Sequence, residues 1–130
     1  MNVIDSSAWL EYFAAGENAA FFAASIEDVQ KLIVPTLSLY EVFKRVLQQR
    51  SENEALHIAA VMQQGLLVDL DAKIAVSAAR LSIDHRLPMP DSVILATARE
   101  HHATLWTQDA HFEGIAGVKY RKEPSRRSNR

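Results

Sequence analysis

The sequence contains no cysteine. This absence excludes disulfide bonds, zinc–thiolate sites, iron–sulfur clusters and catalysis by a thiol nucleophile. No apolar run approaches the ~20 residues that a membrane-spanning helix needs. The first residues, MNVIDSSAWLEYF, lack the basic segment that begins a secretory signal. We therefore expect a soluble, cytoplasmic protein with no membrane contact.

Glycine and proline are also sparse, with four of each in 130 residues, and no flexible linker divides the chain. Hydrophobic residues make up 48% and charged residues 23%, which is typical of a folded domain. Basic residues gather at the end: from Lys119 onward there are six, against the single acid Glu123. We expect one domain over residues 1–120 and a flexible basic tail over residues 121–130. Such a tail is either a solvated end or a contact for a polyanion.

Short apolar runs alternate with helical patterns along the chain. The predicted strands are residues 1–5, 31–34, 66–70, 104–107 and a small one at 118–120. The predicted helices are residues 8–13, 17–26, 37–49, 52–63, 72–85 and 92–101, and Thr36, Asp71 and Asp91 are the expected caps of the third, fifth and sixth. Because strands that alternate with helices need crossovers, this order predicts an α/β fold with a mostly parallel sheet and helices on both faces.

Four acids follow the predicted strands or begin helices. Asp5 ends the first strand, Asp109 follows the fourth, Glu41 lies in the helix after the second, and Asp91 opens the helix after PMP. Since sites in parallel sheets form beyond the carboxyl ends of the strands, the four side chains are expected to converge. Taken singly, each Asp is also a good helix cap, and Glu41 has basic neighbours on its own helix with which it could pair.

The residues after Asp91, SVILATA, are nearly all apolar or small, which indicates a helix buried on most sides. A carboxylate at the mouth of such a helix, near other carboxylates, is costly unless a positive charge joins it. Mg²⁺ and Mn²⁺ prefer carboxylate oxygens, whereas the lack of cysteine and of paired histidines disfavours zinc. His111 is near Asp109 in sequence but is expected to be a surface residue rather than a ligand.

Four segments together resemble the PIN domain family, and specifically the VapC-type toxin ribonucleases: VIDSSAWLEYF, LSLYEVFKRV, LPMPDSVILATA and LWTQDAHFEGIAGV. They span roughly residues 1–119 in the order of the family. The resemblance implies a three-layer α/β/α fold with a short, mostly parallel sheet of four to five strands. It also implies a Mg²⁺- or Mn²⁺-dependent endoribonuclease that acts as the toxin of a toxin–antitoxin pair.

The resemblance also implies roles for individual residues. Asp5, Asp91 and Asp109 would hold one firmly predicted metal ion, and Glu41 would either join them or orient the attacking water as a base. Water would attack the phosphate in line and leave a 5′-phosphate and a 3′-hydroxyl. Ser6 and Thr107 match hydroxyl positions that border the pocket, although a cap and a strand-end residue are equally simple interpretations. Glu113, the next acid, stays outside this set.

RNA binding at an acidic pocket requires positive groups around it. The candidates are Lys44, Arg45, Arg86 and Arg99, each of which could equally be a solvated surface residue. Aromatic stacking on single-stranded RNA could come from Trp9, Tyr12 or Trp106, although each is also a good core residue.

Aromatic and large apolar side chains crowd the first two predicted helices: Trp9, Leu10, Tyr12, Phe13, Phe21 and Phe22. The resemblance implies that such a groove accepts an amphipathic helix of a cognate antitoxin, whose basic side chain reaches the acidic pocket. It also implies a homodimer. Simple core packing is the alternative interpretation of the same residues.

Other functions remain open at the level of sequence. A non-catalytic PIN-like module that binds RNA or a partner, and a PIN nuclease that cuts DNA, both fit the four acids. A phosphatase or phosphotransferase with an Asp after its first strand needs a second Asp two residues later, where this chain has Ser7. A dinucleotide-binding domain is disfavoured because no GxGxxG motif follows the first strand.

Overall fold

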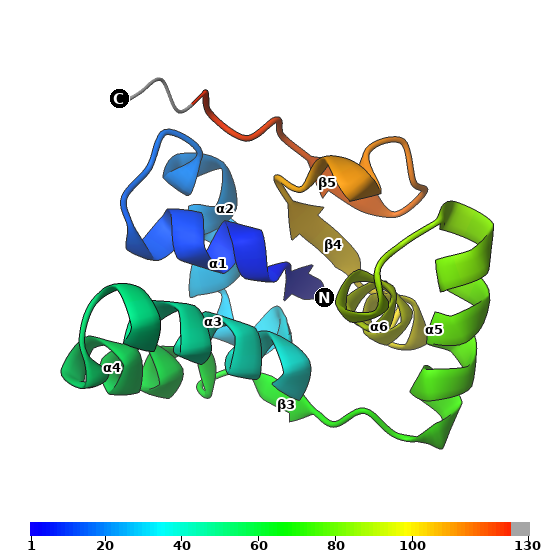
Figure 1. Cartoon of the computed structure of the whole chain (residues 1–130), viewed down its shortest axis with the longest axis horizontal. Coiled ribbons are helices and arrows are strands. Elements are labelled where there is room, and N and C mark those ends of the chain that lie inside the picture. The colour runs from blue at the N-terminus through cyan, green and yellow to red at the C-terminus, as the bar shows by residue number, and fades with distance from the viewer. Residues whose placement is uncertain (126–130) are drawn as a thin grey trace.

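The computed structural model describes residues 1–125. Figure 1 shows a central sheet with α1–α4 on its left and α5 and α6 on its right. In chain order the elements are β1 (Asn2–Ile4), α1 (Ser6–Phe13), α2 (Ala19–Glu27), the 3-10 turn η1 (Val29–Lys31), β2 (Leu32–Pro35), α3 (Thr36–Gln49), α4 (Glu52–Met62), β3 (Leu66–Val68), α5 (Ala72–His85), α6 (Met89–Glu100), β4 (Thr104–Thr107), the 3-10 turn η2 (Ala110–Phe112) and β5 (Val118–Tyr120).

The sheet has five parallel strands in the order β3-β2-β1-β4-β5. The chain therefore moves outward in one direction through β2 and β3 and then crosses to the other side of β1. The carboxyl ends of β1 and β4 lie next to each other at the switch between these directions, where α/β proteins place their sites. The predicted three-layer α/β/α fold with a short parallel sheet is confirmed.

Alternate residues of the strands face two separate cores. Val3, Ile33 and Leu105 pack against α5 and α6. Ile4, at the next position of β1, belongs to the other core, which includes residues of α1, α2, α3 and α4. The central strands are buried on both faces for this reason, and their sequences are uninterrupted apolar runs rather than alternating ones.

Three local expectations were wrong. The third strand ends at Val68 rather than at Leu70, and as an edge strand it leaves Leu66 exposed. The third helix begins at Thr36 itself, with Pro35 at the cap position and no side-chain cap. The sixth helix begins at Met89, because Pro at its second position is compatible with a first helical turn. Asp91 therefore lies within that turn and does not cap the helix.

The predicted boundary between a domain and a flexible tail stays a prediction, since residues 126–130 of the tail lie outside the described residues. Arg121 and Lys122 do contact the body of the protein: the backbone N–H of Arg121 donates to the carbonyl of Thr107, and the carbonyl of Lys122 accepts from Asn18. Within residues 1–125, no helix has the length and apolar character that crossing a membrane would require.

Candidate functional site

Two of the predicted acids come from adjacent strands. Asp5 follows β1 directly, and its backbone N–H donates to the carbonyl of Trp106 in β4 at 2.9 Å. Asp109 comes two residues after the end of β4, and its side chain accepts from the backbone N–H of His111 at 2.9 Å. The expected cap at Asp109 is thus present at η2. The pairing of β1 with β4 brings both carboxylates to one edge of the sheet.

Asp5 is buried, and two hydroxyl groups orient its carboxylate. Ser7 Oγ donates to Asp5 Oδ2 at 2.7 Å, and Thr107 Oγ1 donates to the same oxygen at 2.9 Å. Asp5 stands at the cap position of α1, but its side chain makes no cap hydrogen bond. The carboxylate therefore contacts α1 only through the Ser7 hydroxyl, and no hydrogen bond from residues 1–125 engages Oδ1.

Glu41 reaches the same region from the first half of α3. Its Oε1 accepts a hydrogen bond from Ser6 Oγ at 2.7 Å. The alternative that Glu41 pairs with Lys44 or Arg45 on its own helix is wrong for the described residues, because no such ion pair forms there. Ser6 thus joins the start of α1 to the acid of α3.

Asp91 and Asp109 meet around an imidazole. His111 Nδ1 lies 3.0 Å from Asp109 Oδ1 and 3.3 Å from Asp91 Oδ2. One ligand atom from each of these three residues lies within 4.8 Å of the others. Asp91 Oδ2 is buried and accepts no hydrogen bond, a costly state for a carboxylate oxygen.

Burial and nearby negative charges raise the pKa values of two of these carboxyl groups. Burial raises the pKa of Asp5 from 3.8 to about 6, against the hydrogen bonds from Ser7 and Thr107, which lower it. Burial also raises the pKa of Asp91 to about 7, and the charges of Asp5 and Asp109 add to this effect. The effect of Asp5 on Asp91 indicates that all these carboxylates share one electrostatic environment.

A divalent cation fits this arrangement. An unsatisfied buried oxygen and raised carboxyl pKa values both indicate a place where positive charge is missing. The donors are mainly carboxylate oxygens, which suit Mg²⁺ or Mn²⁺ better than softer metals. His111 supplies the one nitrogen, and when protonated it supplies positive charge instead.

His111 was expected on the surface, and its side chain is indeed 57% exposed, yet it also lies within the acidic cluster. Its position two residues after Asp109, in a tight turn, is the signal that could have identified it. Ser7 was also missed as a site residue, because a serine at a helix start is usually interpreted only as a cap.

The predicted basic residues lie at different distances from the acids. Arg45, on α3, lines a cleft together with Ser6 and Ser7. Arg86 is the left-handed residue that ends α5, three residues before α6 begins. Arg99 is at the far end of α6 from Asp91, about 12 Å along the helix axis.

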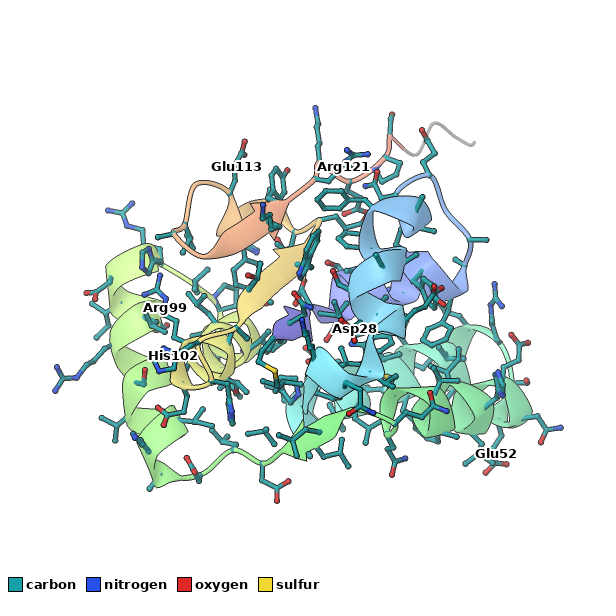
Figure 2. All side chains as sticks on the ribbon, turned by 180° about the vertical axis from the view of Figure 1, so that it is seen from behind. Asp28, Glu52, Arg99, His102, Glu113 and Arg121 are labelled. Atoms are coloured by element: carbon teal, nitrogen blue, oxygen red, sulfur yellow. The ribbon has the colours of Figure 1, made fainter. Side chains whose placement is uncertain are left out.

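Figure 2 shows Arg99 beside His102 at that far end of α6, and its guanidinium donates to the carbonyl of Ala116 at 3.2 Å. Glu113 is exposed and extends outward from the loop before β5 (Figure 2). Lys44 lies over the ring of Tyr40, with 5.6 Å between Nζ and the ring centroid.

The cleft beside the acids has a volume of about 490 Å³ and lies between α1, α3 and α4. Leu10 and Phe13 line it, whereas Trp9 and Phe22 are fully buried in the core. Phe21 packs edge-on against Trp106. The apolar residues of the first two helices are thus divided between core and cleft, and the binding of a partner helix in the cleft stays a prediction.

A second groove, of about 620 Å³, is lined by residues of α3 and α4, which pack against each other. It is mainly apolar, and its lining includes Leu39 and Phe43 together with the exposed side chains of Tyr40, Leu47 and Leu56. Concave apolar surface of this kind is typical of a contact with another protein.

The arrangement of five parallel strands and clustered acids defines a small α/β domain with an acidic site at one edge of its sheet, and the comparison with protein families agrees. The PIN domain model matches residues 3–118. The chain therefore belongs to the PIN domain family. A comparison with curated protein sequences gave no significant match.

Several solved structures with the same fold are of toxins or toxin–antitoxin complexes. A toxin–antitoxin complex from Klebsiella pneumoniae is 22% identical, with a TM-score of 0.76 over 92% of this chain and 96% of that chain. VapC20 from Mycobacterium tuberculosis, described as a toxin that cleaves the sarcin–ricin loop, is 15% identical, with a TM-score of 0.73 over 89% and 95%. VapBC2 from Rickettsia felis, bound to promoter DNA, is 12% identical, with a TM-score of 0.70 over 93% and 97%.

Proposed function

We propose that this protein is a VapC-type toxin that hydrolyses RNA phosphodiester bonds with Mg²⁺ or Mn²⁺. The observation that carries the proposal is the buried Asp91 Oδ2, which accepts no hydrogen bond. Burial raises the pKa of Asp91 to about 7, and the nearby carboxylates of Asp5 and Asp109 add to this effect. A ligand of opposite charge would stabilise the ionised form of this cluster, and raised pKa values of this kind gather at functional sites.

Asp5, Asp91 and Asp109 would hold the cation. When bound, it would polarise a phosphoryl oxygen of the substrate and lower the pKa of a water molecule. Ser7 and Thr107 orient Asp5 so that Oδ1 stays available. Glu41, fixed by Ser6, either binds the cation as well or accepts the proton of the attacking water. Cleavage would leave a 5′-phosphate and a 3′-hydroxyl.

Substrate binding would draw on positive groups around the acids. Arg45 is best placed for this among the predicted residues, because it lines the cleft that begins at Ser6 and Ser7. Arg86 would contribute from the turn before α6, and Lys44 from the outer face of α3. The position of Arg99 at the other end of α6 favours a structural role, through its bond to Ala116.

A protein partner is part of the proposal. Complexes of a toxin with an antitoxin are among the structures with this fold. An amphipathic antitoxin helix would occupy an apolar groove of this protein, and a basic side chain from it would neutralise the acids. That the chain forms a homodimer in a cytoplasmic setting also stays a prediction.

RNA cleavage by the purified protein tests the function. The wild-type protein is expected to cut single-stranded RNA in millimolar Mn²⁺ or Mg²⁺, and cleavage is expected to stop when the metal is chelated. Asp91→Asn removes one ligand charge at constant shape, and we expect it to lower the rate at least about 100-fold. Asp84→Asn, on the exposed face of α5, is the matched control and should cleave like wild type.

The substrates separate the alternatives. A DNA-directed nuclease would cut single- or double-stranded DNA of the same sequence and spare the RNA. A non-catalytic binding module would bind RNA without cutting it at any metal concentration. Equal cleavage by Asp91→Asn and wild type would contradict the assignment of the acids.

A further inference from the structure

Two buried amide side chains lie next to the acidic cluster. Asn18 is in the loop between α1 and α2, Gln108 follows β4 directly, and each is 6% exposed. Asn18 Nδ2 donates to Gln108 Oε1 at 3.0 Å and to the carbonyl of Lys122 at 2.9 Å. Both hydrogens of the Asn18 amide therefore have acceptors, from segments 90 and 104 residues away in sequence.

Gln108 is the middle residue of the turn that shapes the site. Before it, Thr107 Oγ1 donates to Asp5 Oδ2 and accepts from the backbone N–H of Asp109. The backbone N–H of Gln108 itself is 3.5 Å from Ser7 Oγ, the other hydroxyl that donates to Asp5. The turn from Thr107 to Asp109 thus contacts both hydroxyls that orient Asp5 and carries one of the acids.

The surroundings make Asn18 the anchor of this turn. Its own backbone N–H donates to Glu11 Oε2 at 2.9 Å, which ties the loop back to α1. On the other side, the Arg121 guanidinium lies 4.5 Å from the ring centroid of Phe21, so the segment after β5 stays against α2. Figure 2 shows Arg121 at this junction. Without the Asn18 amide, the buried side-chain oxygen Oε1 of Gln108 would lose its hydrogen bond from Asn18 Nδ2. An unsatisfied buried oxygen is costly, which favours a shift of the turn.

We propose that Asn18 is a positioning residue of the metal site. Through Gln108 it fixes the turn from Thr107 to Asp109, and thereby the directions of the Asp5 and Asp109 carboxylates. Its side-chain hydrogen bonds go to Gln108 and Lys122 rather than to an acid. The inference rests on the proposed function, because it concerns the same acids.

Calorimetric titration of the full-length protein with Mn²⁺ alone, without RNA, tests the role. We expect Asn18→Ala to weaken Mn²⁺ binding about tenfold, as other residues that orient metal ligands do. Asn18→Ser is a milder variant that retains one donor and keeps the test open if the alanine variant folds poorly. Gln108→Ala should have a similar effect, and the double variant should bind Mn²⁺ no more weakly than the single ones, because both act through one hydrogen bond.

Asn2→Ala is the matched control. Asn2 Oδ1 accepts a hydrogen bond from Trp106 Nε1 in β4 at 2.8 Å, so this contact also joins residues far apart in sequence. Asn2 lies at the start of β1, however, whereas Asp5 follows its end. This variant should lower the melting temperature and leave the Mn²⁺ affinity unchanged. If Asn18→Ala and Asn18→Ser both bind Mn²⁺ as tightly as wild type, the positioning role of Asn18 is overturned and the proposed function is not affected. Failure of the wild type to bind Mn²⁺ would overturn the proposed function together with it.

Discussion

At the scale of single residues, the site is a balance between carboxylates that repel and hydroxyls that orient them. Asp5 accepts two short hydrogen bonds at one oxygen, yet its pKa is still raised to about 6 because burial outweighs them. Asp91 has no such donors, and its pKa reaches about 7. Without a cation, the repulsion between the carboxylates therefore increases as the pH rises through about 7, because Asp91 then loses its proton.

These pKa values predict a pH dependence of stability in metal-free buffer. Asp5 and Asp91 bind protons more tightly in the folded protein than in the unfolded chain, from a pKa of 3.8 to about 6 and about 7. Between about pH 4 and pH 7 the folded state thus holds more protons, and the free energy of unfolding falls as the pH rises. With EDTA present, the melting temperature should drop by several degrees between pH 5 and pH 7.5.

Asp91→Asn removes one of these two groups, the one whose pKa is raised further. The drop in melting temperature should therefore become smaller, and the variant should be more stable than wild type at pH 7.5 without metal. Asp84→Asn should keep the wild-type profile. A profile of Asp91→Asn that follows wild type would mean that the pH dependence comes from other groups.

The sequence was enough to place these four acids near one edge of the sheet, because Asp5 and Asp109 follow recognisable strands and Glu41 and Asp91 lie near the starts of recognisable helices. Their roles in catalysis and metal binding stay predictions. The contacts around them could not. Nothing local links Asn18 to Gln108, and Ser7 looks like an ordinary residue of a helix start. Such contacts depend on the exact distance between elements, which a single sequence does not encode in any periodic pattern.

At the scale of elements, α6 positions Asp91 because the central part of this helix is buried. From Ser92 to Ala98 every residue is buried, between the sheet and α5. The apolar sequence SVILATA predicted this correctly. The predicted start of this helix was wrong, because Pro90 was interpreted as a residue that ends the preceding helix. Proline also fits the first turn of a helix, and α6 begins at Met89.

Burial of α6 predicts a large contrast between two isoleucines. Ile94→Ala empties a fully buried position and should lower the free energy of unfolding by about 2–5 kcal/mol. Ile83→Ala, on α5, changes a side chain that is 80% exposed and should alter it by less than about 0.5 kcal/mol. Chemical denaturation measures both, and similar losses in the two variants would contradict the packing described here.

At the scale of the whole molecule, the acids join segments from both ends of the chain. Asp5 comes from the first strand, Glu41 from α3, Asp91 from α6 and Asp109 from the end of β4. The sheet order explains why they meet, since β1 and β4 are neighbours at its centre. A ligand that binds all of these segments at once must stabilise the complete fold rather than one element.

Binding of Mn²⁺ should therefore raise the melting temperature of the entire protein. At a hundredfold excess over the dissociation constant, mass action adds about 2.7 kcal/mol to the free energy of unfolding. For a chain of this size that corresponds to a shift of about 10 °C, measured by scanning calorimetry. At one fixed Mn²⁺ concentration, the shift in melting temperature should be larger at pH 7.5 than at pH 5.5. The reason is that protons compete with the cation for the carboxylates of Asp5 and Asp91. Asp91→Asn should lose most of the shift, and an equal shift in this variant would place the bound cation elsewhere on the protein.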